Sequence, residues 1–460
     1  MKTFLVAVCC TLTAVALPMN RIEGAAARQA SKSSSMDKHA EEYVRLVLAL
    51  GQHDADYVDA YYGPPEWKKA AEATKLTLDA IAARAGALAT QLSRERPVAG
   101  EPAARAARSG VANASNTAPE AEMQSLRLQY LRQQVSSMSA RIRMLKGERL
   151  SFDDESRALY DAVAPTFPES HFQAILNRLE KRFPGSGPLV GRYDAFRRAF
   201  VVPRQKLDPV FQRAIQACRE RTLKHVELPP DERFTVEYVT NRSWSGYNWY
   251  KGGFRSLIQV NTDLPIYIDR AVDLACHEGF PGHHVYNALL ERHLVRDRGW
   301  VEFTVYPLFS PQSLIAEGTA NFGIEVAFPG RDRVDFEQAT LFPLAGLDPK
   351  RAAEYYEVQA LVDQLSYAGN EAARRYINKE IDAAQATTWL ERYALMPHDR
   401  AAQRVRFFDQ YRSYVINYNL GKDMVRRYIE SRGGTPDKPE TRWKEFERLI
   451  SSPRLPSGLH

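Results

Sequence analysis

Cysteine and long apolar runs are scarce in this 460-residue chain. Of the four cysteines, Cys9 and Cys10 lie in a short apolar stretch at the N-terminus, which leaves Cys218 and Cys276 for the rest. Two cysteines form one disulfide at most, so the chain is not a small disulfide-stapled scaffold. Beyond the N-terminus no segment approaches 18 consecutive apolar residues, and no transmembrane helix is therefore predicted.

Blocks of one charge sign are also absent. The chain has 62 basic and 56 acidic residues, a net charge of only +6, and the basic residues are scattered. No Lys/Arg block interleaved with aromatic residues occurs, which argues against nucleic acid as a partner. The hydrophobic fraction of 44% and charged fraction of 26% are ordinary for a soluble globular protein.

The N-terminus has the pattern of a secretory signal peptide, residues 1–16. Lys2 precedes an apolar run that ends in Ala14-Val15-Ala16, a small-x-small cleavage site. The alternative is a buried N-terminal helix. We expect an exported protein, periplasmic or extracellular, without stable membrane insertion after cleavage near Leu17.

The remaining chain predicts a mainly α-helical protein. Residues 17–37, rich in serine, form a flexible lead-in, and 38–455 form one helical domain of one or two lobes. An Ala-, Pro-, Ser- and Asn-rich stretch at about 97–121 indicates a low-complexity insertion. Aromatic and β-branched residues over 234–261 predict a small antiparallel sheet. That sheet is either a structural hairpin or an edge on which an extended peptide lies.

The segment 277–284 reads His-Glu-Gly-Phe-Pro-Gly-His-His and is similar to the His-Glu-x-x-His signature of zinc metallopeptidases. A helix is expected to begin near Leu264-Pro265 and to carry His277. The ring of Pro281 would clash with the His277 carbonyl, so the helix cannot continue regularly. A two-residue bulge at Pro281-Gly282 would return His283 to the face of His277, whereas a wide kink would select His284.

The third metal ligand is expected from the next helix. Ser310-Pro311 is a helix-start pattern, Glu317 lies on that helix, and Pro329-Gly330 ends it. Two histidines and one glutamate suit a single catalytic Zn²⁺ with an open position for water, and Glu278 would be the general base. For orienting a ligand histidine the choices are Asn321 and Asp273, although either could be an ordinary polar residue.

The same residues, with Glu317-Gly318 and Leu365-Ser366-Tyr367, resemble the bacterial family called domain of unknown function 885. That family is similar to the helical gluzincin peptidases. The resemblance implies a gluzincin-like fold and a zinc site made by His277, Glu278, His283 and Glu317. It departs at Thr319, where the family has Trp, and at 360–364, where the family has Pro-Gly-Gln-Ala.

Peptide hydrolysis also needs a donor for the oxyanion, and Tyr367 is the first choice. The helically spaced Tyr411, Tyr414 and Tyr418 are interpreted mainly as core packing, although one of them could reach the cleft and act as the donor. To hold a terminal carboxylate, Arg404, Arg406 and Arg412 are available.

The predicted function is zinc-dependent cleavage of a peptide or small amide. The alternatives are a zinc hydrolase of non-peptide amides or esters, and a catalytically silent helical binding protein.

Overall fold

The computed structural model describes residues 34–96, 119–242 and 244–459. The predicted signal peptide, nearly all of the lead-in and most of the insertion therefore lie outside the described residues. The described chain is mainly helical with few strands, which confirms the predicted fold class. Among the described residues, no helix combines the length and the apolar character that crossing a bilayer requires.

The helices of the first half are α1 (Ser35–Leu50), α2 (Pro65–Thr74), α3 (Leu78–Arg94), α4 (Glu120–Leu145), α5 (Phe152–Tyr160), α6 (Glu169–Arg182), α7 (Leu189–Arg198) and α8 (Leu207–Thr222). Those of the second half are α9 (Asp269–Leu274), α10 (His283–Leu290), α11 (Pro311–Ala327), α12 (Asp332–Phe336), α13 (Phe342–Ala345), α14 (Ala352–Val362), α15 (Ala368–Ile377), α16 (Ala383–Tyr393), α17 (His398–Tyr411), α18 (Ile416–Ser431) and α19 (Pro439–Ile450). The strands are β1 (Val58–Tyr61), β2 (Arg233–Val239), β3 (Gly246–Gly252), β4 (Arg255–Asn261) and β5 (Val305–Pro307).

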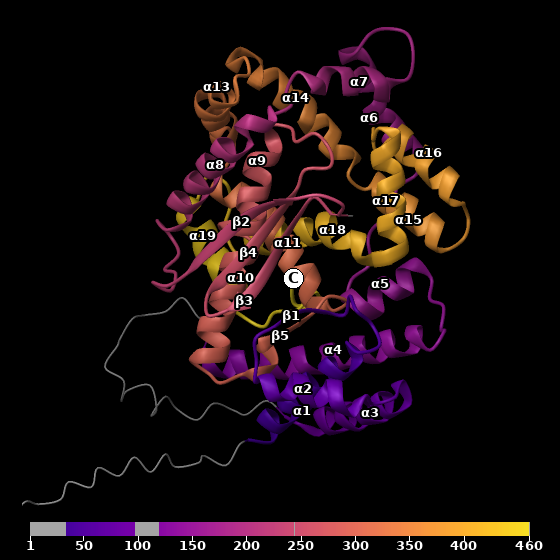
Figure 1. The fold of residues 1–460 in the computed structure, drawn as a ribbon, viewed down its shortest axis with the longest axis vertical. Helices are drawn as coiled ribbons and strands as arrows, with labels where there is room; N and C mark the ends of the chain where they lie inside the picture. The colour runs from indigo at the N-terminus through magenta and orange to yellow at the C-terminus, as the bar shows by residue number, and fades with distance from the viewer. Residues whose placement is uncertain (1–33, 97–118, 243, 460) are drawn as a thin grey trace, which may run out of the picture.

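The first helix illustrates how local sequence sets these elements. Ser34 and Asp37 form a capping box that begins α1, and apolar side chains such as Tyr43, Val47 and Leu50 make its buried face. In Figure 1, α1 to α4 lie at one end of the molecule, and α7, α13 and α14 lie at the other. The sheet, α10, α11 and α18 lie between these two ends.

The predicted sheet is present, with a mixed topology. Strands β3 and β4 are an antiparallel hairpin, whereas β2 pairs with the other edge of β4 and runs parallel to it. The chain reverses once between β2 and β3 and again between β3 and β4, so β2 and β4 point the same way. The sequence pattern identified the strands but not the order of strands across the sheet.

The helix ahead of His277 begins later than Leu264-Pro265. Residues 266–268 instead pair with the segment 200–202, because Val202 N–H donates to the Ile266 carbonyl and Ile268 N–H donates to the Phe200 carbonyl. A tertiary contact thus overrides the local helix-start pattern, and α9 starts only at Asp269.

Helix α11 matches its prediction, running from Pro311 to Ala327 with Ser310 at its N-cap position. It packs directly against α18 through two glycines. A Cβ built on Gly318 would lie 2.5 Å from the carbonyl carbon of Gly421, and one on Gly421 would lie 2.7 Å from the Leu314 oxygen. Only glycine permits this backbone contact, which fixes α11, and with it Glu317, against α18.

Candidate metal centre

The backbone around His277 leaves the α-helical register before the chain reaches Pro281. Residues Ala275–Gly279 form a π-helical turn, in which Phe280 N–H donates to the Ala275 carbonyl at 3.1 Å. The N–H of Gly282 then donates to the Cys276 carbonyl at 2.9 Å, and α10 begins at His283. A Cβ on Gly282 would lie 1.9 Å from the His277 oxygen, so this break requires glycine. The predicted interruption at Pro281-Gly282 is confirmed.

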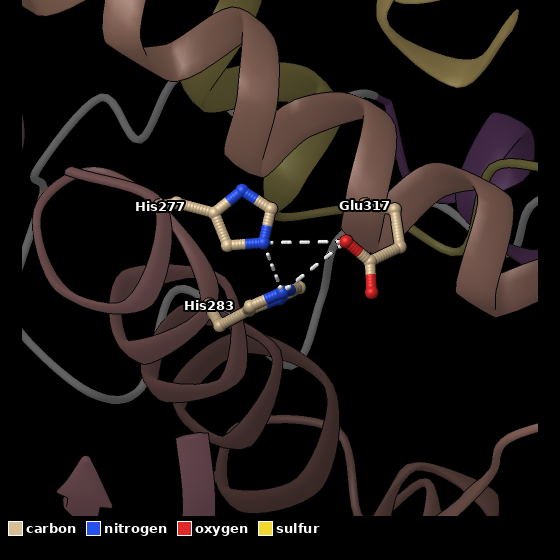
Figure 2. A group of neighbouring side chains, drawn as sticks. All are labelled: His277, His283 and Glu317. Carbon is tan, nitrogen blue, oxygen red and sulfur yellow. Dashed lines mark hydrogen bonds and ion pairs between the residues drawn. The ribbon is translucent and has the colours of Figure 1, made fainter. Parts of the chain in front are cut away.

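The break brings His283, rather than His284, to His277. Figure 2 shows the two imidazoles and the Glu317 carboxylate pointing toward one centre. The Nε2 atoms of His277 and His283 are 3.1 Å apart, and Oε2 of Glu317 lies 3.2 Å from the first and 3.7 Å from the second. Within the described parts of the chain, these three residues form a group with ligand atoms close enough to hold one metal ion.

These separations suit a tetrahedral zinc ion. Zinc–nitrogen bonds of about 2.0–2.1 Å place neighbouring ligand atoms of a tetrahedron about 3.3–3.4 Å apart. The three distances of 3.1, 3.2 and 3.7 Å bracket that edge. Three protein ligands leave a fourth position open, as in catalytic zinc sites.

His284, the alternative second ligand, has hydrogen-bond partners outside the candidate metal group. His284 is fully buried, its Nδ1 lies 2.9 Å from Ser256 Oγ, and its Nε2 lies 3.0 Å from Glu232 Oε2. Both ring nitrogens therefore have partners on the sheet side of α10, away from Glu317. His284 has the contacts of a structural residue.

Partners behind two of the three ligands orient them. Asn321 Nδ2 donates to the Tyr418 carbonyl at 3.2 Å, which leaves Asn321 Oδ1 to accept a hydrogen bond from His277 Nδ1–H at 3.1 Å. That bond selects the tautomer in which Nε2 carries the lone pair. On the other side, Tyr414 hydroxyl donates to Glu317 Oε1 at 2.7 Å, so Oε2 is the oxygen left for the centre.

The charge balance of the group also fits a cation. Oε2 of Glu317 is buried, and apart from the two histidine rings no described residue offers it a hydrogen bond. Burial alone lowers the pKa of His277, but Glu317 and Glu278 outweigh it and raise that pKa. Burial opposes ionisation of Glu317, yet the two histidines hold its pKa well below the ordinary value. A divalent cation would satisfy the orphaned oxygen and both lone pairs together.

Glu278 lies beside the group without belonging to it. Its side chain is buried and lines the same cavity as the three candidate ligands, and burial raises its pKa above that of an ordinary glutamate. Its backbone carbonyl accepts a hydrogen bond from Asn248 Nδ2 at 2.7 Å, which ties this residue to β3. This is a suitable position for a general base adjacent to a metal ion.

The start of β3 limits where the Glu278 carboxylate can lie. A Cβ on Gly246 would be 2.9 Å from Glu278 Oε1 and 2.8 Å from Leu274 Cδ2. We expect Gly246→Ala to displace the carboxylate while leaving the fold and the metal group intact, since both contacts are side-chain ends. Misplacing a reacting group by about 1 Å costs on the order of 10²-fold in rate.

This prediction is checked by measuring turnover, bound zinc and the melting temperature of Gly246→Ala. Gly86→Ala is the matched control, because a Cβ on Gly86 in α3 meets nothing within 4 Å. Unchanged turnover in Gly246→Ala would show that this glycine does not position the base.

Two sequence-derived candidates lie apart from the group. Asp273 forms ion pairs with Arg270 at 3.1 Å and Arg333 at 2.8 Å, which agrees with its interpretation as an ordinary polar residue. Tyr367 lines the same cavity, but its hydroxyl donates to Asp423 on α18 at 2.7 Å. No hydrogen bond joins Tyr367 to the candidate ligands in the described chain.

Two neighbours of the group had no clear signal in the sequence. Tyr414, interpreted there as core packing, contacts Glu317 directly. Asp59 on β1 lines the cavity and accepts a hydrogen bond from Tyr247, and burial raises its pKa to about 7 despite the opposing effect of His283. The Asp59 side chain comes from far upstream, in a segment without any recognisable motif.

The candidate metal centre opens into a large cavity of about 1480 Å³. Its walls include the start of β3, α11, α17 and α18. Of the three arginines considered from the sequence, Arg404 lines this cavity, whereas Arg412 is paired with Glu155 at 2.6 Å and Arg406 is exposed on α17.

Comparisons with known proteins add little to this geometry. No family model matches the chain, and no curated protein matches its sequence. A solved structure of a "putative lipoprotein" from Colwellia psychrerythraea is 15% identical with a TM-score of 0.46, and the match covers 74% of this chain and 62% of that one. A "putative lipoprotein of unknown function" from Shewanella oneidensis is 13% identical with a TM-score of 0.42, covering 91% of this chain and 81% of that one. The match thus spans less than two thirds of the Colwellia chain.

Proposed function

We propose that this chain is an exported, zinc-dependent hydrolase that cleaves peptides. One observation carries the proposal: two imidazole nitrogens and one carboxylate oxygen lie at 3.1, 3.2 and 3.7 Å from one another, with a buried glutamate beside them. His277, His283 and Glu317 would hold the ion. Export rests on the signal-like residues 1–16 alone.

The chemistry divides between the ion and the chain. When bound, zinc polarises a carbonyl group and makes a water molecule more acidic. Glu278 takes the proton of the attacking water and returns it to the leaving amine. Asn321 keeps His277 in the tautomer that offers Nε2, and Tyr414 keeps Glu317 turned so that Oε2 faces the centre.

The developing oxyanion needs a donor, and two tyrosines of the cavity are available. Tyr418 lines the cavity, interacts electrostatically with Glu317 and Glu278, and burial raises its pKa well above the ordinary value, so its hydroxyl keeps its proton. Tyr367, the candidate from the sequence, is bound to Asp423 and would have to release that contact. The contacts favour Tyr418 for this role.

Two features favour peptides over smaller substrates. The cavity of about 1480 Å³ exceeds the roughly 300–1,000 Å³ typical of small-molecule pockets. Strand β3 is an edge strand of its sheet, and its residues Gly246, Tyr247 and Asn248 line the cavity next to Glu278. An extended peptide can add to such an edge by backbone hydrogen bonding.

The test is a digest by the full chain loaded with one equivalent of zinc. Bound zinc is measured after dialysis, and a mixture of unmodified peptides, acyl anilides and esters is followed by mass spectrometry, with chelator-stripped protein as the control. We expect stoichiometric zinc and zinc-dependent peptide cleavage. Cleavage of esters or anilides alone would favour the non-peptide hydrolase, and bound zinc without any cleavage would favour a silent binding protein.

A further inference from the structure

Helix α17 places two arginines without ion pairs on the wall of the cavity that holds the candidate metal centre. Arg400 and Arg404 are four residues apart, so they lie on one face of the helix, and both line this cavity. The exposed Arg406 is two residues further along α17 and does not line the cavity.

Other cations of this cavity have counter-charges. Arg270 pairs with Asp273, Arg333 with Asp273 and Glu337, and Arg426 with Glu325 and Asp423. For Arg400 and Arg404, no carboxylate lies within ion-pair distance among the residues that the structure describes. Arg404 Nε is also buried without a hydrogen-bond partner. A buried N–H of a guanidinium without an acceptor is unfavourable, and an anionic ligand would supply one.

The surroundings of Arg404 hold it near the metal group. Its guanidinium lies over the rings of Phe407 at 4.6 Å and Tyr418 at 5.7 Å. The Tyr418 ring in turn lies 5.8 Å from the ring of Tyr414, whose hydroxyl binds Glu317. Two aromatic rings, those of Tyr418 and Tyr414, thus connect Arg404 to the Glu317 carboxylate. A few residues of an extended peptide, at about 3.3–3.6 Å each, can span such a separation.

We propose that Arg404 binds a carboxylate of the substrate, with Arg400 as a second cation one helical turn away. Resting on the proposed function, this inference narrows the substrates to peptides with an anionic group close to the scissile bond. A C-terminal carboxylate and an Asp or Glu side chain present the same chemistry to a guanidinium, which binds either in a bidentate manner.

The experiment uses three pools of N-acetylated tetrapeptides that differ only at the C-terminus. One pool ends in a free carboxylate, one in a carboxamide, and one in a glutamate followed by a carboxamide; Asp and Glu are otherwise left out. Cleavage by the zinc-loaded chain is followed by mass spectrometry, and binding is followed by calorimetry with zinc-loaded Glu278→Gln.

We expect at least one anionic pool to be preferred over the neutral pool by about 10–100-fold, the range of a charge-assisted hydrogen bond. The free-acid and glutamate pools distinguish the two carboxylate sources. Arg404→Gln should abolish the preference, Arg404→Lys should restore part of it, and Arg406→Gln should leave it unchanged.

The outcomes separate this inference from the proposed function. Cleavage or binding that does not distinguish the anionic pools from the neutral pool in the unaltered protein overturns the inference, even if peptides are hydrolysed. An undiminished preference in Arg404→Gln overturns it as well. Carboxylate-selective binding without any hydrolysis supports the role of Arg404 and contradicts the proposed peptidase function. Because the pool comparison needs only the unaltered protein and Glu278→Gln, it holds even if Arg404→Gln fails to fold.

Discussion

His283→Ala is expected to purify without stoichiometric zinc, whereas His284→Ala retains it. His283 Nε2 lies 3.1 Å from His277 Nε2 and 3.7 Å from Glu317 Oε2, so its removal leaves two ligands of three. Loss of a partner that only orients a ligand typically costs 10–100-fold in metal affinity, and loss of a ligand itself should cost more. The measurement is zinc per chain after dialysis against a weak chelator.

The control variant His284→Ala should lose stability but keep its zinc. His284→Ala leaves Ser256 and the buried Glu232 without their imidazole partner, although Arg219 still pairs with Glu232. An unpaired buried polar group costs roughly 1–3 kcal/mol, so the melting temperature should fall while zinc stays bound. If His284→Ala does not fold, His284→Gln supplies the same comparison. Zinc retained in His283→Ala and lost in His284→Ala would reverse the assignment.

Glu278→Gln should keep zinc and lose most turnover, by about 10²–10⁴-fold, the usual contribution of general acid–base catalysis. The amide has nearly the same shape and leaves the contact between Asn248 and the backbone carbonyl of Glu278 intact. It can no longer accept a proton, so only the chemical step is affected.

The matched control for this variant is Asp363→Asn, which makes the same carboxylate-to-amide change on the wall of the same cavity. Asp363 is outside the metal group and its side chain forms no ion pair with the described residues. Its turnover should stay within a few-fold of the unaltered protein. Near-normal turnover in Glu278→Gln, with zinc bound, would show that Glu278 is not the general base.

Features set by local sequence could be predicted from the sequence. Helix α11 begins at the predicted Pro311 and ends before Pro329-Gly330, and α1 begins at a capping box made by Ser34 and Asp37. The position of His283 beside His277 also depends on neighbours in the chain, because the π-helical turn Ala275–Gly279 and the Pro281-Gly282 pair interrupt the regular helix there. Steric effects of this kind act within a few residues and can be inferred without the fold.

The features that could not be predicted from the sequence depend on contacts between segments that are distant in the chain. The start of α9 is set by pairing of residues 266–268 with residues 200–202, and the parallel pairing of β2 with β4 is set by strand order. Which tyrosine of the stripe after α17 reaches Glu317 depends on how α18 crosses α11. The same holds for Arg404, which differs from Arg406 and Arg412 only by the surface it faces.

Because α11 is fixed by its glycine contact with α18, the candidate metal centre cannot be complete before α18 has been synthesised and packed. A chain synthesised as far as Glu317 already contains all three candidate ligands, yet the α18 backbone that fixes α11 through Gly421, and the Tyr414 hydroxyl that orients the carboxylate, come about a hundred residues later. A partly made chain would therefore offer a zinc ion only two histidines and a poorly restrained glutamate. Metal capture is thus expected to follow folding instead of nucleating it.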